Sequence, residues 1–243
     1  TKVQVEESAD EDTIRFDVAG AEVATLTNSA LTLKGTTPTL TIGDAGAEDT
    51  KIVFDGNAQD YHIGLDDTDD DLKIGLGSAL GTTPHMVFDE TGAITKPLQP
   101  SFLVFNSATD ANATGDGTAV TVDFNSEVID ANNDFASDTF TAPVAGKYFL
   151  QTTVFLQQTE DSTNTRYRLI IVTSNRTYVL HEKRLMRQND GGQNLADVCG
   201  SAVVDMDASD TAIVQVAVYG GAAVVDIWGN SQPETYFSGC LLA

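Results

Sequence analysis

Residues 147–157 read KYFLQTTVFLQ, and this stretch decides the fold because polar and apolar side chains alternate along it. A period of two residues is typical of a strand with one buried face. The same alternation recurs at Arg166–Thr173 and Ala212–Tyr219, and clusters rich in Gly, Asn and Asp separate the segments. We therefore predict an all-β protein whose second part is a sandwich or jelly roll of roughly ten strands.

The composition indicates a folded, acidic protein. Hydrophobic residues make up 41% of the 243 residues, charged residues make up 20%, and the formal net charge is −23. A field of that sign repels phosphate backbones, so we expect no nucleic acid as a partner. No apolar run approaches the roughly 20 residues that span a bilayer, so we expect no membrane insertion. With three His and two Cys, we expect neither a metal site nor a cofactor.

Two prolines, Pro97 and Pro100, mark a boundary because each interrupts a strand ladder. On the N-terminal side, at residues 1–97, short and Gly-punctuated segments predict a repetitive β-strand shaft region. On the C-terminal side, at residues 98–243, longer and more apolar strands predict a jelly-roll head region.

The shaft region repeats itself. The motif IRFD at residues 14–17 returns as IVFD at 52–55 and as MVFD at 86–89, each with a glycine soon after. Each unit is a short strand and a turn, too small to bury its own apolar face. We expect such units to stack on each other or on copies in other chains. The plainer alternative is that Phe-Asp-Gly steps are common hairpin ends.

The acidic run at residues 66–71 imitates the first ligands of a calcium loop. Leu72 stands where the turn-forming Gly should be, and Ser78 stands where a bidentate Glu should be. We therefore interpret Asp66–Asp71 as a solvated turn.

Both cysteines, Cys199 and Cys240, sit inside apolar runs. A free thiol in such a run behaves as a small hydrophobic group, so we expect two buried free thiols rather than a disulfide.

Three segments of the head region resemble hallmark segments of the complement globular-head (C1q-like) family: FTAPVAGKYFL at 140–150, GSAVVDM at 200–206 and YFSGCLL at 236–242. That family shares its jelly roll with tumour necrosis factor. The resemblance implies a compact homotrimer with both termini at the base of the head and receptor-contacting loops at the top and sides. Ser209 and Cys240 depart from the family pattern.

The lead-in from Gly92 to Phe102 resembles the junction between a repetitive β-shaft and such a head in bacteriophage tail fibres. This resemblance implies a virion protein that assembles with other tail or fibre proteins and recognises a bacterial surface receptor, a glycan or an outer-surface protein. The alternatives are a purely structural virion or capsid-decorating fibre and a bacterial extracellular adhesin.

We expect no enzyme activity. The 36 acidic residues supply many chance pairs, and no spacing singles out a catalytic pair. His62, His85 and His181 lack the context of an activated nucleophile.

Six basic residues of the head region fall close together in an otherwise acidic chain. Such a cluster can meet anionic sugars or pair with carboxylates, and we favour pairing, either within the chain or across a subunit interface. The six are Arg166, Arg168, Arg176, Lys183, Arg184 and Arg187.

Strands that run alternately up and down place the turns at 143–146, 173–176 and 207–210 at the base of the head. The turns at 107–118, 157–165, 187–197 and 229–235 then fall at the distal end, where long polar loops favour recognition. Trp228 and Tyr236 have a second interpretation, as core or interface residues at strand ends. The predicted receptor-binding residues are Asn112, Asp161, Asn164, Arg187, Asn189, Asp190, Asn194, Trp228, Asn230 and Glu234.

Overall fold

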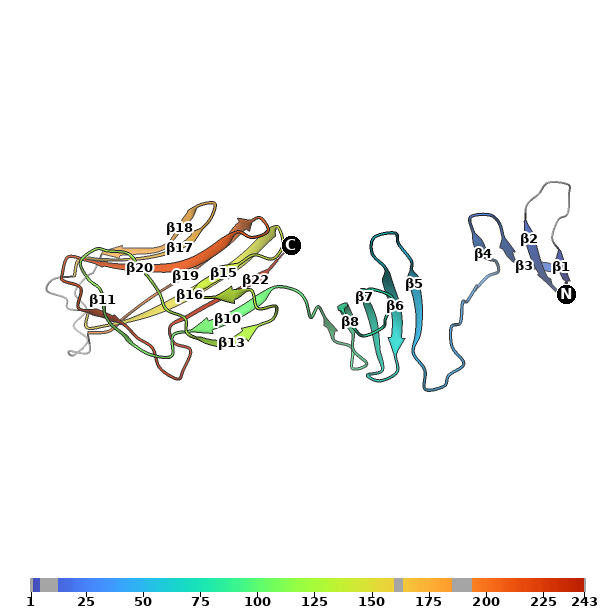
Figure 1. The fold of residues 1–243 in the computed structure, drawn as a ribbon, viewed down its shortest axis with the longest axis horizontal. Coiled ribbons are helices and arrows are strands. Elements are labelled where there is room, and N and C mark those ends of the chain that lie inside the picture. The colour runs from blue at the N-terminus through green and yellow to red at the C-terminus, as the bar shows by residue number, and fades with distance from the viewer. Residues whose placement is uncertain (1, 5–12, 160–163, 185–193, 243) are drawn as a thin grey trace. The chain divides into compact units, whose positions relative to one another are not determined.

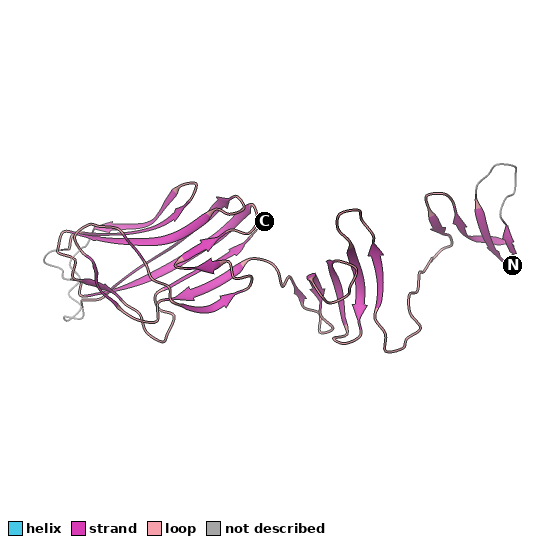
Figure 2. Ribbon diagram, in the orientation of Figure 1, coloured by secondary structure: helices cyan, strands magenta, loops and turns pink. Residues whose placement is uncertain are grey.

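The computed structural model describes residues 2–4, 13–159, 164–184 and 194–242. Every regular element among them is a β-strand (Figure 2), which confirms the predicted all-β class. The chain divides into two compact units, one of Thr1–Thr83 with Val87–Ile94 and one of Pro84–Met86 with Thr95–Ala243. The boundary at residue 97 stays a prediction.

The first four strands form an antiparallel sheet in the order β1-β2-β3-β4. Ala19 and Gly20 turn the chain between β2 and β3 with φ values of 53° and 85°, which are left-handed values suited to a tight hairpin. The strands are β1 (Lys2–Gln4), β2 (Ile14–Val18), β3 (Ala21–Leu26) and β4 (Leu31–Leu33).

A second sheet follows in the order β5-β6-β7-β8-β9. The repeated motifs IRFD, IVFD and MVFD fall on β2, β5 and β8, so each repeat is a strand as predicted. Residues 67–70 form an exposed turn between β6 and β7, as predicted for the acidic run, but Asp66 corrects that prediction because it is buried at the end of β6. The strands are β5 (Thr50–Phe54), β6 (Tyr61–Asp66), β7 (Asp71–Leu76), β8 (Pro84–Phe88) and β9 (Ile94–Thr95).

The head region is a sandwich of two sheets (Figure 1). One sheet has the order β11-β21-β16-β22-β10-β13, with β19 paired to β16 along its length. Its strands are β10 (Ser101–Phe105), β11 (Asp110–Thr114), β13 (Ser126–Asp130), β16 (Gly146–Gln157), β19 (Ala196–Met206), β21 (Val225–Ile227) and β22 (Tyr236–Leu241).

The other sheet has the order β14-β15-β20-β17-β18, with β12 paired to β20. The chain crosses between the sheets from β15 to β16, from β16 to β17, from β18 to β19 and from β19 to β20, and this antiparallel alternation defines a jelly roll. The strands of this second sheet are β12 (Val120–Thr121), β14 (Phe135–Ala136), β15 (Thr139–Thr141), β17 (Arg166–Thr173), β18 (Thr177–Arg184) and β20 (Thr211–Tyr219).

The alternation in residues 147–157 has the predicted effect. Tyr148, Leu150, Thr152, Val154 and Leu156 are fully buried between the sheets, while the residues that alternate with them face outward. The described part of the head holds thirteen strands rather than about ten, because pairings of two or three residues, such as β12, are too short to show a period.

Stacked aromatic rings fill the centre of the core. The ring centroid of Phe102 lies 4.6 Å from that of Phe140 and 4.9 Å from that of Phe237, distances at which aromatic pairs attract each other. These rings come from strands of both sheets, so they hold the sandwich together.

Both cysteines are free, as predicted, but the prediction that both are buried is wrong. Cys199 is exposed and Cys240 is half-buried. The buried positions beside them belong to Val198 and Gly239, so the alternation of the strands turns both thiols to the outer face of the sheet.

Candidate binding surface

The turns at 143–146, 173–176 and 207–210 meet at one end of the sandwich, as predicted. Asn175 Nδ2 donates to Asp210 Oδ2 at 2.8 Å, and the backbone N–H of Ser209 donates to the carbonyl of Ala142 at 2.7 Å. These bonds close the base of the head and leave the opposite end for the longer turns.

At the distal end, the buried carboxylate of Asp226 ties three segments together (Figure 1 shows β11 at this end). Its Oδ1 accepts the backbone N–H of Asn112 at 2.7 Å, and its Oδ2 accepts the side-chain amide of Gln158. Sequence analysis missed Asp226. The signal was present, because an acidic residue inside the apolar run Ala222–Trp228 needs a buried partner.

Next to this anchor, Trp228, Asn230 and Glu234 form one cluster. Glu234 Oε2 accepts two bonds of 2.6 Å, one from Trp228 Nε1 and one from Asn230 Nδ2. Trp228 and Asn230 are half-buried, and Glu234 is exposed. The carboxylate therefore fixes the indole and the amide in one orientation at the surface.

Gly229 allows this loop to lie close against the segment that follows β10. A Cβ at Gly229 would come within 2.3 Å of Asn106 Oδ1 and 2.5 Å of the Ala108 carbonyl. Asn106 is fully buried, and its Nδ2 donates to Asp110 Oδ2 at 2.9 Å. Sequence analysis missed this support, which holds the Trp228 loop on a rigid base.

The cluster of Trp228, Asn230 and Glu234 contains the chemical groups that sugar-binding and peptide-binding sites use. An indole offers a flat apolar surface, and the neighbouring amide and carboxylate offer hydrogen bonds at its edge. Of the predicted residues, Trp228, Asn230 and Glu234 are the ones that direct bonds bring together.

Three other predicted residues lie apart from this cluster. Asn112 is exposed but lies in strand β11 rather than in a loop, in a bulge with a φ of 55°. Asn194 is half-buried, and its carbonyl accepts the Thr159 N–H at 3.0 Å. Asn164 is only 5% exposed, which corrects its assignment as a receptor contact: the side chain lies beneath the surface of a single chain.

The remaining predicted residues fall outside the described part of the chain. They are Asp161, Arg187, Asn189 and Asp190.

Three of the six basic residues are paired within the chain, which is one of the two forms of pairing that we favoured. Arg166 donates to Glu182 at 3.1 Å and lies over the ring of Tyr219, 3.9 Å from its centroid. Arg168 lies 3.7 Å from the same carboxylate of Glu182. Arg176 pairs with Asp205 at 2.8 Å. These pairs neutralise charge that could otherwise meet an anionic ligand.

Two aspartates near the distal support have a raised pKa. Burial, with the nearby charges of Asp123 and Asp138, raises the pKa of Asp110. Burial, with the nearby Asp138, also raises the pKa of Asp123. Within the described residues, however, no group of His, Cys, Asp or Glu is arranged to hold a metal ion.

The outer face of the β10-β22-β16-β19 sheet carries apolar side chains in two rows, with a more polar row between them. Phe149 stands in register between Cys240 on β22 and Val203 on β19, and Val203 is 56% exposed. Phe105 and Tyr236 belong to a parallel row two steps along the same face, beyond the row that contains Leu103, Ser238 and Gln151. In a single chain, solvent covers this face.

No protein-family model matches the sequence, and no curated protein matches it. Among solved structures, the chain is similar to murine APRIL, with 12% identity, a TM-score of 0.39 and coverage of 59% of this chain and 99% of that one. It is also similar to the Eiger TNF of S. frugiperda, with 11% identity, a TM-score of 0.41 and coverage of 60% of this chain and 93% of that one. The strand order of its two sheets defines the head region as a jelly roll. The described residues include no helix that is long and apolar enough to cross a membrane.

Proposed function

We propose that this chain is a non-enzymatic, homotrimeric binding protein whose head recognises a receptor through its distal end. The observation that carries the recognition role is the Trp228 cluster. Glu234 holds the half-buried indole in place, and Gly229 lets the loop lie close against buried Asn106. The indole is therefore a preorganised contact surface.

The outer face of the β10-β22-β16-β19 sheet supports the trimer. Phe149, Cys240 and Val203 form an uncharged row across β16, β22 and β19, in which Val203 is exposed and Cys240 is half-buried. Contiguous apolar surface of this kind marks a protein interface. TNF-like domains usually form homotrimers, and packing this face against other copies would remove it from water.

The finer proposal is a bacteriophage tail-fibre tip in the virion, assembled with other tail or fibre proteins, that binds a glycan or protein on the bacterial surface for host adsorption. It is supported by the resemblance of residues 92–102 to a shaft–head junction and by the repeats of the shaft region. The three strands that carry these repeats lie outside the jelly roll, as expected for a shaft that presents a head.

The test measures binding of the fluorescently labelled full chain to a panel of bacterial strains by flow cytometry. We expect binding to a subset of strains, at least tenfold weaker in Trp228→Ala. The matched control is Tyr178→Ala, which removes a half-buried aromatic ring at the base, where Tyr178 donates to Asp205 at 3.1 Å.

Equal binding by wild type and Trp228→Ala would remove the distal loop from recognition. Binding lost equally in both variants would point to a general defect of the head instead. If the panel includes hosts to which the parent particle adsorbs and the chain binds none of them, the recognition role itself is wrong.

A further inference from the structure

The second sheet of the shaft region buries several polar side chains and leaves most of its large apolar side chains accessible. Among the described residues before Thr95, Val87, at 9% exposure, is the one large hydrophobic side chain that is buried. His62, Asp66 and Lys73 are buried in the same sheet. Hydrophobic burial is the main favourable term in folding, so a sheet arranged in this way lacks its principal source of stability in a single chain.

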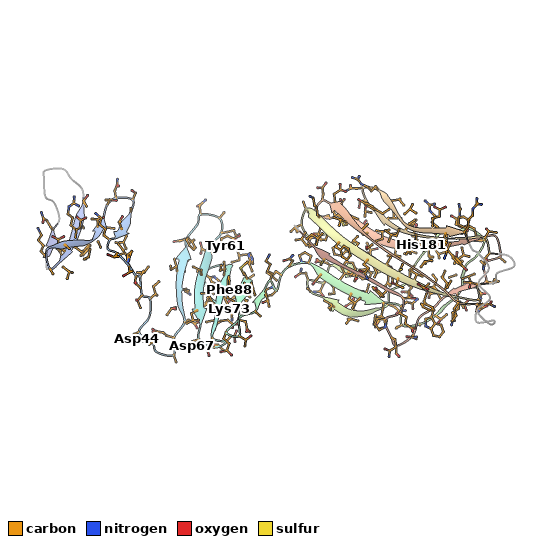
Figure 3. All side chains as sticks on the ribbon, turned by 180° about the vertical axis from the view of Figure 1, so that it is seen from behind. Asp44, Tyr61, Asp67, Lys73, Phe88 and His181 are labelled. Carbon is orange, nitrogen blue, oxygen red and sulfur yellow. The ribbon has the colours of Figure 1, made fainter. Side chains whose placement is uncertain are left out.

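The apolar side chains lie in register on one face of β5, β6 and β7. Ile52, Ile63 and Ile74 form a central row across the three strands. Flanking rows consist of Phe54, Tyr61 and Leu76 on one side and Thr50, Leu65 and Leu72 on the other. These rows contain no charged residue, and Phe54, Tyr61 and Leu65 are 61%, 44% and 43% exposed (Tyr61 is labelled in Figure 3).

On the opposite face of the sheet, β6 and β7 are already covered by polar contacts. His62 Nδ1 lies 2.8 Å from the Gly77 carbonyl, and a Cβ on Gly75 would come within 2.8 Å of the His62 ring. Lys73 Nζ donates to Asp66 Oδ2 at 2.7 Å and also to Asp69. The continuous open apolar surface therefore lies on the other face, and on this face Val53 of β5 remains exposed.

Size and charge identify what covers this face. Eight large apolar side chains, five of them between 38% and 61% exposed, lie together on this face, and a contiguous apolar patch of several hundred Å² marks an interaction surface. In a chain of net charge −23, association between copies is opposed by repulsion unless the contact excludes charge. The three rows do exclude it, so identical faces can meet without placing like charges together.

We propose that the apolar face of β5, β6 and β7 packs against the same face of the other two copies of this chain and forms a core shared between chains. This inference rests on the proposed trimer and extends it from the head to the shaft region. It also accounts for the repeats, because a strand motif that cannot bury its own face is stable once neighbouring copies supply the other half of the core.

Two neighbouring residues provide a matched test. Ile52 and Val53 are β-branched and adjacent in β5, are 42% and 37% exposed in a single chain, and point to opposite faces of the sheet. Each is replaced by cysteine in the full chain that carries Cys199→Ser and Cys240→Ser, and the rate of thiol labelling by a small disulfide reagent is measured in buffer and in urea.

We expect Ile52→Cys to react at least tenfold more slowly than Val53→Cys in buffer and at the same rate in urea. The mass of each variant is measured in parallel by light scattering. A mass of three chains with equal labelling rates in buffer overturns this inference and leaves the proposed trimer intact. A mass of one chain overturns both, even if Ile52→Cys is slow, because the covering segment would then belong to the same chain.

Discussion

Gly239 shows why one residue of the closing strand has to be small. It lies on the buried side of β22, where a Cβ would come within 2.5 Å of Leu150 Cδ2 and 2.7 Å of Phe102 Cε1. Both neighbours are themselves packed in the core, with exposures of 0% and 3%. The glycine in the FSG motif is therefore a packing requirement of the core.

We expect Gly239→Ala to lower the free energy of unfolding by about 1–3 kcal/mol, the usual cost of overpacking a core. Urea denaturation followed by tryptophan fluorescence measures it. Ser238→Ala, one residue earlier and on the outer face, is the control and should change the stability little. If Gly239→Ala left the free energy of unfolding unchanged, the neighbouring core side chains would have to move apart at this point without loss of stability.

Asp123 should make the stability of the head depend on pH. Burial and the nearby Asp138 raise its pKa, so folding favours its protonated form. The stability gained from protonation is present below the unfolded pKa of about 3.9 and is lost as the pH rises through the folded value. Asp123→Asn, which stays neutral, should therefore raise the melting temperature at pH 7 more than at pH 4.

Asp116 provides the control of opposite sign for this experiment. The backbone N–H of Thr118 donates to its Oδ1 at 2.9 Å and lowers the pKa of this carboxyl. The ionised carboxylate of Asp116 stabilises the fold at pH values above its unfolded pKa, and this stabilisation is lost as the pH falls and the group is protonated. Asp116→Asn should therefore lower the melting temperature at pH 7. Thermal melts of both variants are measured at pH 4 and pH 7. Shifts of the melting temperature with the same sign at pH 7 would contradict the opposite directions of the two pKa shifts.

Residue types in turns predicted the binding surface only in part. Trp228, Asn230 and Glu234 were predicted as separate candidates, and the bonds to Glu234 join them. Asn164 shows the limit, because an Asn in a turn is favourable whether its amide faces solvent or the interior. Burial depends on what the rest of the fold places over the turn, and a local pattern does not contain that information.

At the scale of the element, strands with a buried side were predictable from their period. β16, β17 and β20 carry apolar residues at alternate positions, and their bounds agree with the pattern to within a residue. β12 and β14 span two residues each, so they have no period to detect. The outward positions of the cysteines on β19 and β22 were not predicted either. Each cysteine lies among apolar residues in the sequence, and that setting suggested burial whichever face of the strand the cysteine occupies.

Two exposed valines, one on the outer face of each sheet of the head, test which sheet forms the trimer contacts. Val203 on β19 is 56% exposed on the face proposed for trimer contacts, and Val179 on β18 is 47% exposed in the other sheet. Val203→Asp should shift the mass measured by light scattering from three chains toward one, because an aspartate would bury three like charges near each other. Val179→Asp should leave the mass unchanged, and the reverse result would assign the interface to the other sheet.

At the scale of the whole molecule, the two regions differ in how they bury apolar surface. The head has a continuous core that runs from Phe102 to Phe237. The described residues of the shaft region bury Val87 and otherwise leave their large hydrophobic side chains partly or largely accessible in a single chain. Their stability should thus depend on concentration, whereas the core of the head is complete within one chain.

Separate expression of residues 1–97 and 98–243 tests this difference. The head fragment should unfold in urea in one cooperative transition whose midpoint changes little with protein concentration, since its core needs no second chain. The shaft fragment should have a lower midpoint that rises with concentration, because its apolar face is covered by association. A shaft fragment that unfolds cooperatively at a concentration-independent midpoint, with the mass of one chain, would mean that residues 1–97 build a core of their own and that the open face of β5, β6 and β7 is covered from within the chain.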